Sequence, residues 1–270
     1  MGLFSWLFGT DESKITDPKE QHDRGVNYEY GWNGFEKDYS KAIYWHEKAA
    51  AQGNERSMFS LGLIYCEHLK DYTKALMWYK KAAEAGDELA KNSLGTMYME
   101  GKGLSQPDYE RAIFWKMQAA NGHNDGFSEG DLGIIYFKGL GMLKPNYKQA
   151  IYWFDRSLTH GLKWPVKYLG SIYEHVLPYK NLTTAFSYYL KGADLPSPYC
   201  IKKVAYMYQN GLGVEKNIGE ANKWYNEITE GREMVDNLKE LNVGDELTWS
   251  LWDEDATDLL RMDQIGTINE

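Results

Sequence analysis

Apolar and small residues recur along the chain with the period of an α-helix, in a block that occurs six times. Each block begins with Asp or Asn, has Ala four residues later, a large aromatic residue after three more, and then a mostly small residue after four more. Offsets of 4, 7 and 11 place these side chains on one helical face. Asp or Asn is a favourable N-cap, and the Gly that closes most blocks is typical of a helix C-terminus. We name the predicted element helix B.

The six copies start 33 to 38 residues apart, a period typical of solenoids built from helix pairs. The capping residues are Asp38, Asp71, Asp108, Asn146, Asn181 and Asn217. The Ala and aromatic pairs are Ala42 and Trp45, Ala75 and Trp78, Ala112 and Trp115, Ala150 and Trp153, Ala185 and Tyr188, and Ala221 and Trp224. The aromatic residues alternate with small ones at core spacing, so we interpret them as repeat packing rather than as a platform for nucleic-acid bases.

A second motif, Leu-Gly-x-x-Tyr, precedes helix B and predicts a partner helix, which we name helix A. Its intact copies begin at Leu61, Leu94, Leu132 and Leu169, and weaker copies lie at Gly25 and at Val204. Leu and Tyr four residues apart share a helical face. Gly inside a helix costs up to about 1 kcal/mol relative to Ala, so its recurrence predicts a close helix contact with no room for a Cβ. The turn between A and B is often Gly-x-Gly.

Together these motifs resemble Sel1-like repeats, which are relatives of tetratricopeptide repeats, over roughly residues 17 to 231. The best local match runs from Asp71 to Gly86, and the fifth repeat departs most, with Gly192 in place of Ala. The resemblance implies an all-α protein, an α/α solenoid that forms a right-handed superhelix of about six helix-turn-helix repeats. It also implies a concave face and a non-repeat C-terminal cap. Relatives are mostly adaptors, scaffolds and proteins of signalling or secretion, and some bacterial members resemble immunity proteins.

The sequence divides into three parts. Residues 1–16 form an apolar leader or cap, residues 17–231 the repeat array, and residues 232–270 an acidic C-terminal cap or tail. We favour a cap over loose membrane contact for the leader, because an unpaired solenoid end needs cover. Part of the tail is expected to dock on the last repeat, and the alternatives are that it folds into the groove or contacts a partner itself. No stretch approaches the roughly 20 apolar residues of a membrane span.

Composition excludes several function classes. Hydrophobic residues make up 43% and charged residues 26%, which is typical of a folded chain. The net charge of −9 argues against a nucleic-acid binder. It suits a partner with a basic surface, although solubility alone also explains it. Cys66 and Cys200 belong to no CxxC pair, so we expect a reducing, cytoplasmic compartment.

Candidate chemistry is sparse, and we expect no catalytic residue, cofactor or metal site. The segment from Gly95 to Gly103 lacks the spacing and the Ser or Thr of a phosphate-binding loop. The six histidines show no metal-binding spacing. The acidic run at 253–255 lacks the Gly and distal Glu of a calcium-binding loop. The protein is therefore predicted not to be an enzyme, with a hydrolase that uses groove carboxylates as the disfavoured alternative.

The favoured function is a protein–protein interaction module that binds a partner through the concave groove. A more specific form is a bacterial immunity protein that neutralises a toxic effector, and the alternative is a scaffold or adaptor in signalling or secretion. The candidate contacts lie two residues before and one after the repeat Tyr. They are Leu63, Cys66, Thr96, Met99, Ile134, Phe137, Ser171 and Tyr206. These side chains either line the groove or pack between adjacent repeats.

Overall fold

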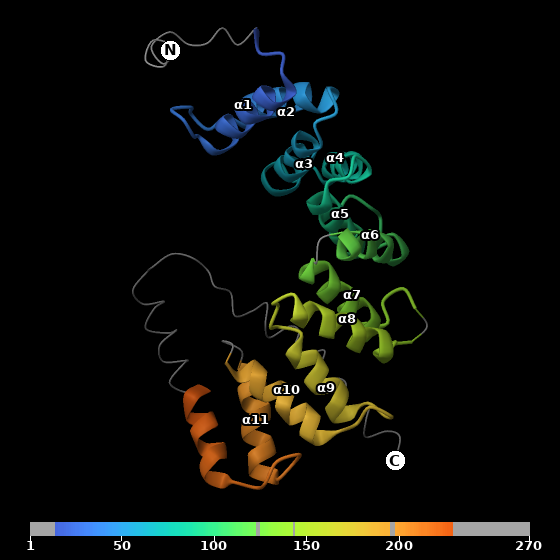
Figure 1. The fold of residues 1–270 in the computed structure, drawn as a ribbon, viewed down its shortest axis with the longest axis vertical. Helices are drawn as coiled ribbons and strands as arrows, with labels where there is room; N and C mark the ends of the chain where they lie inside the picture. Colours follow the sequence, from blue (N-terminus) through green and yellow to red (C-terminus); the bar gives the residue numbers. More distant parts are fainter. Residues whose placement is uncertain (1–13, 123–124, 143, 195–197, 229–270) are drawn as a thin grey trace. The chain divides into compact units, whose positions relative to one another are not determined.

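The computed structural model describes residues 14–122, 125–142, 144–194 and 198–228, and these contain helices joined by turns, with no strand (Figure 1). Helices A are α1 (Pro18–Tyr30), α3 (Glu55–Leu63) with the short π-helix η2 (Ile64–His68), α5 (Glu88–Glu100), α7 (Gly126–Lys138), α9 (Val166–His175) and α11 (Pro198–Asn210). Helices B are α2 (Tyr39–Ala51), α4 (Tyr72–Glu84), α6 (Tyr109–Gly122), α8 (Tyr147–Thr159), α10 (Leu182–Ala193) and a helix over 218–228. The predicted all-α fold of alternating A and B helices is confirmed. Most of the predicted leader and all of the predicted tail lie outside the described residues.

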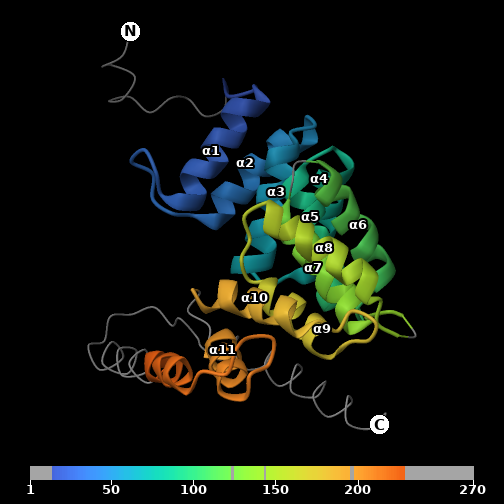
Figure 2. The same ribbon diagram turned by 60° about the horizontal axis from the view of Figure 1, so that its bottom comes forward.

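The chain packs as two compact units, which are described separately. Unit 1 comprises residues 1–135 and 139–143, and unit 2 comprises 136–138 and 144–270. Within each unit, helices contact mainly their neighbours in sequence, which is the contact pattern of a solenoid. In unit 1, α1, α3 and α5 follow one another along one side and α2, α4 and α6 along the other (Figures 1 and 2).

All six predicted N-caps are present. The side chain of each capping Asp or Asn accepts a hydrogen bond from the backbone N–H three residues later, as Asp71 does from Lys74. The backbone N–H of each capping Asp or Asn also donates a hydrogen bond to the carbonyl oxygen of the repeat Tyr on the preceding helix A. The N–O distance is 2.7 to 2.9 Å in all six repeats. One residue therefore starts helix B and also ties it to the end of helix A.

The Gly-x-Gly turns combine backbone conformation with packing. Gly101 and Gly103 have φ angles of 71° and 77°, in the left-handed region that Gly adopts without penalty. A Cβ on Gly103 would lie 2.6 Å from the carbonyl oxygen of Tyr72, at the start of the preceding helix B. The second repeat has no such glycines, and Lys70 adopts a φ of 54° just before its helix B.

The recurrent Gly of helix A marks the predicted close contact, and the structure identifies the side chain that causes it. A Cβ on Gly25 would lie 2.6 Å from the His46 ring, and one on Gly95 would lie 2.8 Å from the Lys116 side chain. Gly62 meets Tyr79 in the same way. In each case the neighbour is the residue after the repeat aromatic on helix B. We name it the bridging position: His46, Tyr79, Lys116, Phe154, Tyr189 and Tyr225.

Replacing Gly62 by Ala tests this contact. We expect Gly62→Ala to lower the free energy of unfolding by about 1–3 kcal/mol, because the added methyl group overlaps the Tyr79 ring. Gly219→Ala is the matched control. Its Cβ would meet Asn217 Oδ1 at 3.3 Å in the first turn of the helix, so a change of less than about 0.5 kcal/mol is expected. Urea unfolding measures both changes, and equal effects at the two sites would refute the contact.

Candidate partner-binding site

The bridging position connects each helix pair to the next. His46, Lys116, Phe154 and Tyr189 have no exposed surface, and Tyr79 is 3% exposed. Tyr225, in the last matched repeat, is 37% exposed. Within the described chain, the bridging side chain is therefore buried in each repeat that is followed by another repeat.

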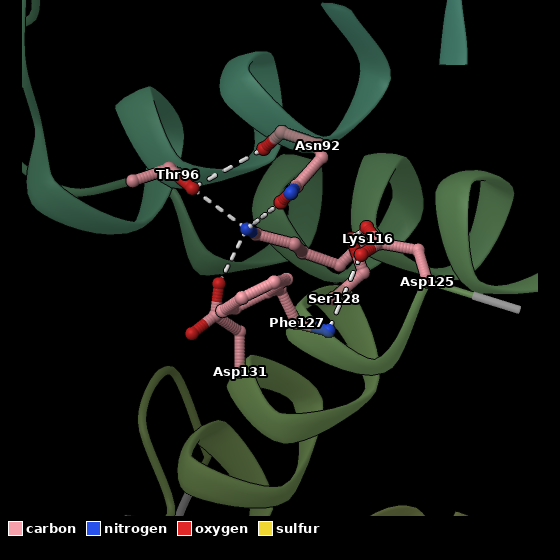
Figure 3. Close-up of polar contacts among 7 residues, drawn as sticks. All are labelled: Asn92, Thr96, Lys116, Asp125, Phe127, Ser128 and Asp131. Carbon is pink, nitrogen blue, oxygen red and sulfur yellow. Dashed lines mark hydrogen bonds and ion pairs between the residues drawn. The ribbon is translucent and has the colours of Figure 1, made fainter. Parts of the chain in front are cut away.

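Lys116 is a buried cation that holds three helices together (Figure 3). Its Nζ donates to Asn92 Oδ1 at 2.5 Å and to Thr96 Oγ1 at 2.6 Å, both on α5. The same ammonium pairs with the Asp131 carboxylate on α7. A buried charge is costly unless it is paired and hydrogen-bonded, and here all three donors of the ammonium have oxygen partners.

Other repeats use the same position with different chemistry. The hydroxyl of Tyr189 donates to Glu174 Oε2 on α9 at 2.7 Å, and its ring lies 6.0 Å from that of Tyr199 on α11. The Tyr79 ring lies 5.6 Å from the Phe59 ring on α3. Each of these side chains contacts a helix A, and the array tolerates a ring or an amine there provided that polar atoms find partners.

His46 forms an arrangement that superficially resembles a hydrolase relay. Its Nε2 lies 3.3 Å from Glu29 Oε2, and its Nδ1 lies 3.4 Å from Ser57 Oγ. Ser57 and His46 have no exposed surface and Glu29 is 2% exposed. A substrate carbonyl cannot reach this Ser hydroxyl in the folded protein, so the three residues act as a structural bridge between α1, α2 and α3.

The eight predicted contact residues fall into three groups. Cys66, Phe137 and Ser171 are buried, Leu63, Thr96, Met99 and Ile134 are half-buried, and Tyr206 is 48% exposed. The buried three pack inside the array and offer almost no surface to a partner.

Phe137 illustrates the second alternative, packing between neighbouring helices, for the buried group. Its ring lies 5.2 Å from that of Tyr168 and 6.0 Å from that of Tyr147.

Cys66 belongs to the hydrophobic core of unit 1. Burial raises the pKa of the Cys66 thiol to about 11 and that of Cys200 to about 12, and both thiols are free.

Two exposed residues on helices A escaped the sequence analysis. Leu89 is 63% exposed and Phe127 is 62% exposed. Each lies seven residues, or two helical turns, before a predicted contact, Thr96 and Ile134 respectively, and so shares its face. A search seven residues before each predicted contact would have found Leu89 and Phe127. The prediction considered only positions next to the repeat Tyr. Leu63, Leu89, Met99, Phe127 and Ile134 together form what we name the A-helix face of unit 1.

Within the ranges that the structure describes, no group of His, Cys, Asp and Glu side chains is disposed to hold a metal ion. None of the helices there has the length and apolar character to cross a bilayer.

The acidity of the chain is concentrated at one end. Residues 232–270 contain eleven acidic and three basic residues, which gives this segment a charge of −8 out of the total of −9. The remainder, with 28 acidic and 27 basic residues, is almost neutral. The net charge therefore says little about the surface of the array itself.

The Sel1 repeat matches the chain at residues 21–54, 56–87, 89–122, 128–162, 169–197 and 198–229. These matches span well over half of the sequence and follow the alternation of A and B helices. The chain therefore belongs to the Sel1 repeat family, whose arrays are protein-interaction modules. No curated protein matches the chain.

Solved structures support the same fold. The protein c5321, a protective antigen present in uropathogenic Escherichia coli strains, is 29% identical over 81% of this chain and 47% of its own, with a TM-score of 0.72. A Sel1 repeat protein from Oxalobacter formigenes is 25% identical over 82% of this chain and 66% of its own, with a TM-score of 0.62. The chain thus spans about half the length of the first protein and about two thirds of the second.

A weaker likeness links the chain to an immunity protein. Pa5087 from Pseudomonas aeruginosa is 20% identical over 64% of this chain and 67% of its own, with a TM-score of 0.39. A likeness this low carries no argument about function.

Acidification is expected to destabilise the contact between the first two repeats. His22 Nδ1 lies 2.9 Å from Ser57 Oγ, and its ring lies 5.3 Å from that of His46. Burial, and then the neighbouring His46, lower the pKa of His22 from its ordinary value of 6.5. The unfolded chain therefore binds this proton more readily, so the associated stability is complete above pH 6.5 and is lost as the pH falls below it.

Urea unfolding between about pH 8 and pH 5 measures this loss. His22→Gln, which removes the titrating ring, should flatten the dependence. Stability that rises on acidification, or an unaltered slope in His22→Gln, would contradict the assignment.

Proposed function

We propose that this protein binds another protein through the A-helix face of unit 1. The observation that carries the proposal is the exposure of two large apolar side chains, Leu89 and Phe127, on the same face as the half-buried Ile134. Solenoids present stacked helices as extended binding surfaces, and exposed apolar residues grouped on one face are typical of such sites. Membership of the Sel1 repeat family supports the same function.

The partner chemistry follows from these residues. Leu63, Met99 and Ile134 are aliphatic or thioether side chains that adapt to an apolar ligand surface. An amphipathic helix or a loop with two or three apolar anchors is the form of ligand that suits such a face. Buried free thiols favour a reducing, cytoplasmic compartment, which we propose as the location.

An immunity protein that neutralises a toxic effector is the more specific form of the proposal, and an adaptor in signalling or secretion is the alternative. A toxin with a basic surface would suit the net charge of −9. Because most of that charge lies in residues 232–270, the tail and not the helix array would supply the electrostatic attraction.

Capture of the partner by the full chain tests the proposal. The tagged protein, used as bait in its own cells, should retain one stoichiometric partner that mass spectrometry identifies. Leu89→Asp and Phe127→Asp should each weaken binding at least about tenfold, because burying a carboxylate in an apolar contact is strongly unfavourable.

Phe114→Asp is the matched control, since Phe114 is 53% exposed but lies on a helix B. Circular dichroism verifies that all three variants fold. Retention of the partner by Leu89→Asp and Phe127→Asp, or equal loss in all three variants, would rule out the A-helix face as the binding site.

A further inference from the structure

The A-helix face carries a carboxylate between its apolar side chains. Asp131 lies on α7 one helical turn after Phe127, on the same side of the helix (Figure 3). Ile134 follows one turn after Asp131. Phe127 is 62% exposed, Ile134 is half-buried, and the Asp131 side chain between them is 23% exposed. The carboxylate therefore reaches the surface in the middle of an apolar row.

The contact with Lys116 uses one of the two oxygens of this carboxylate. Lys116 Nζ pairs with Asp131 Oδ2 and donates its other two hydrogen bonds to Asn92 and Thr96 on α5. Within the described part of the chain, Asp131 Oδ1 has neither a hydrogen-bond partner nor an ion-pair partner. Lys116 cannot supply one, because all three donors of its ammonium are already used. Asp131 thus keeps an acceptor for a group from outside the chain.

A partner that covers Phe127 and Ile134 must also cover this oxygen, because Asp131 lies between the two side chains. An exposed carboxylate oxygen is hydrated, and burying it without a replacement donor is strongly unfavourable. The partner therefore has to place a hydrogen-bond donor opposite Asp131. A Lys ammonium or an Arg guanidinium forms the strongest hydrogen bonds to a carboxylate.

The charges around Asp131 favour a cation over an anion. Helices α5 and α7 together hold four acidic and two basic residues. The buried Lys116 adds a third positive charge and still leaves a negative balance. Lys91, one of the two basic residues, already pairs with Glu88 at 2.8 Å. An acidic ligand would therefore meet repulsion on this face, and a basic one would not.

We propose that the ligand of the A-helix face carries Lys or Arg between two apolar side chains, with the cation paired to Asp131 Oδ1. The inference deepens the proposed function and rests on it. Phe127 and Ile134 are seven residues apart, or about 10 Å along the helix axis. A ligand helix along α7 matches them with apolar residues at positions i and i+7 and the cation at i+4 or, in the opposite orientation, i+3. Since Lys116 holds the carboxylate in place, the pair sets the register of the ligand.

Selection of displayed peptides on the full chain tests the proposal. The probe is a library of peptides of about 18 residues, long enough to form a helix, with Leu fixed at two positions seven residues apart. The residues between the two Leu are randomised. Peptides that bind the wild type and not Phe127→Asp should be enriched in Lys or Arg at the third or fourth residue after the first Leu, and depleted in Asp and Glu there.

One selected peptide and a counterpart with Gln in place of the basic residue then measure the contact itself. On the wild type, loss of the cation should weaken binding at least about tenfold. On Asp131→Asn the two peptides should bind equally. Glu110→Gln, the matched control at an exposed carboxylate on helix B, should retain the difference. Because each comparison is made between two peptides on one protein, any loss of stability in Asp131→Asn cancels.

Three results overturn this inference and leave the proposed function intact. The first is selected peptides that depend on Phe127 but lack the basic residue. The second is equal affinity of the two peptides for the wild type. The third is a preference for the cation that persists in Asp131→Asn, which would place the cation on another carboxylate. If no selected peptide loses binding in Phe127→Asp, the proposed function fails as well.

Discussion

The close approach of helix A to the bridging residue of helix B is the constraint on which the rest of the array depends. The recurrent Gly has no Cβ to hold the helices apart, so the bridging side chain lies directly against the backbone of that Gly. From that place it reaches a second helix A, so one contact organises three helices. Where the residue is Lys116 or His46, a buried polar group enters the core, and Asp131 or Glu29 supplies the partner that makes its burial tolerable.

This packing separates the two surfaces of unit 1. The Leu and Tyr of helix A and the Ala of helix B pack in the core. One row of positions on each set of helices therefore stays at the surface. On helices A these positions hold Leu89 and Phe127, and on helices B they hold Tyr44, Met77 and Phe114. Exposed apolar side chains thus lie on both sets of helices in unit 1. The carboxylates that produce the net charge lie mostly outside the repeats.

The fold was predictable from the sequence because its determinants are local. An Asp or Asn cap and a small-large-small helical face depend on residues within four turns of each other, and all six caps form as expected. The site was less predictable, because burial depends on the neighbouring repeat. Phe137 and Ser171 occupy the predicted register, yet both are buried, and Phe137 lies against rings of the neighbouring helices. The requirement of helix A for Gly was also clear, but its cause, the residue after the aromatic, emerged from the structure.

A double-mutant cycle between Lys116 and Asp131 tests the central claim most directly. Urea unfolding of Lys116→Met, Asp131→Asn and the double variant gives the coupling free energy between the two side chains. Because Lys116 is fully buried and Asp131 joins it from the next helix A, we predict a favourable coupling of about 1–3 kcal/mol. Additive effects of the two substitutions would show that the bridging residue does not tie one repeat to the next.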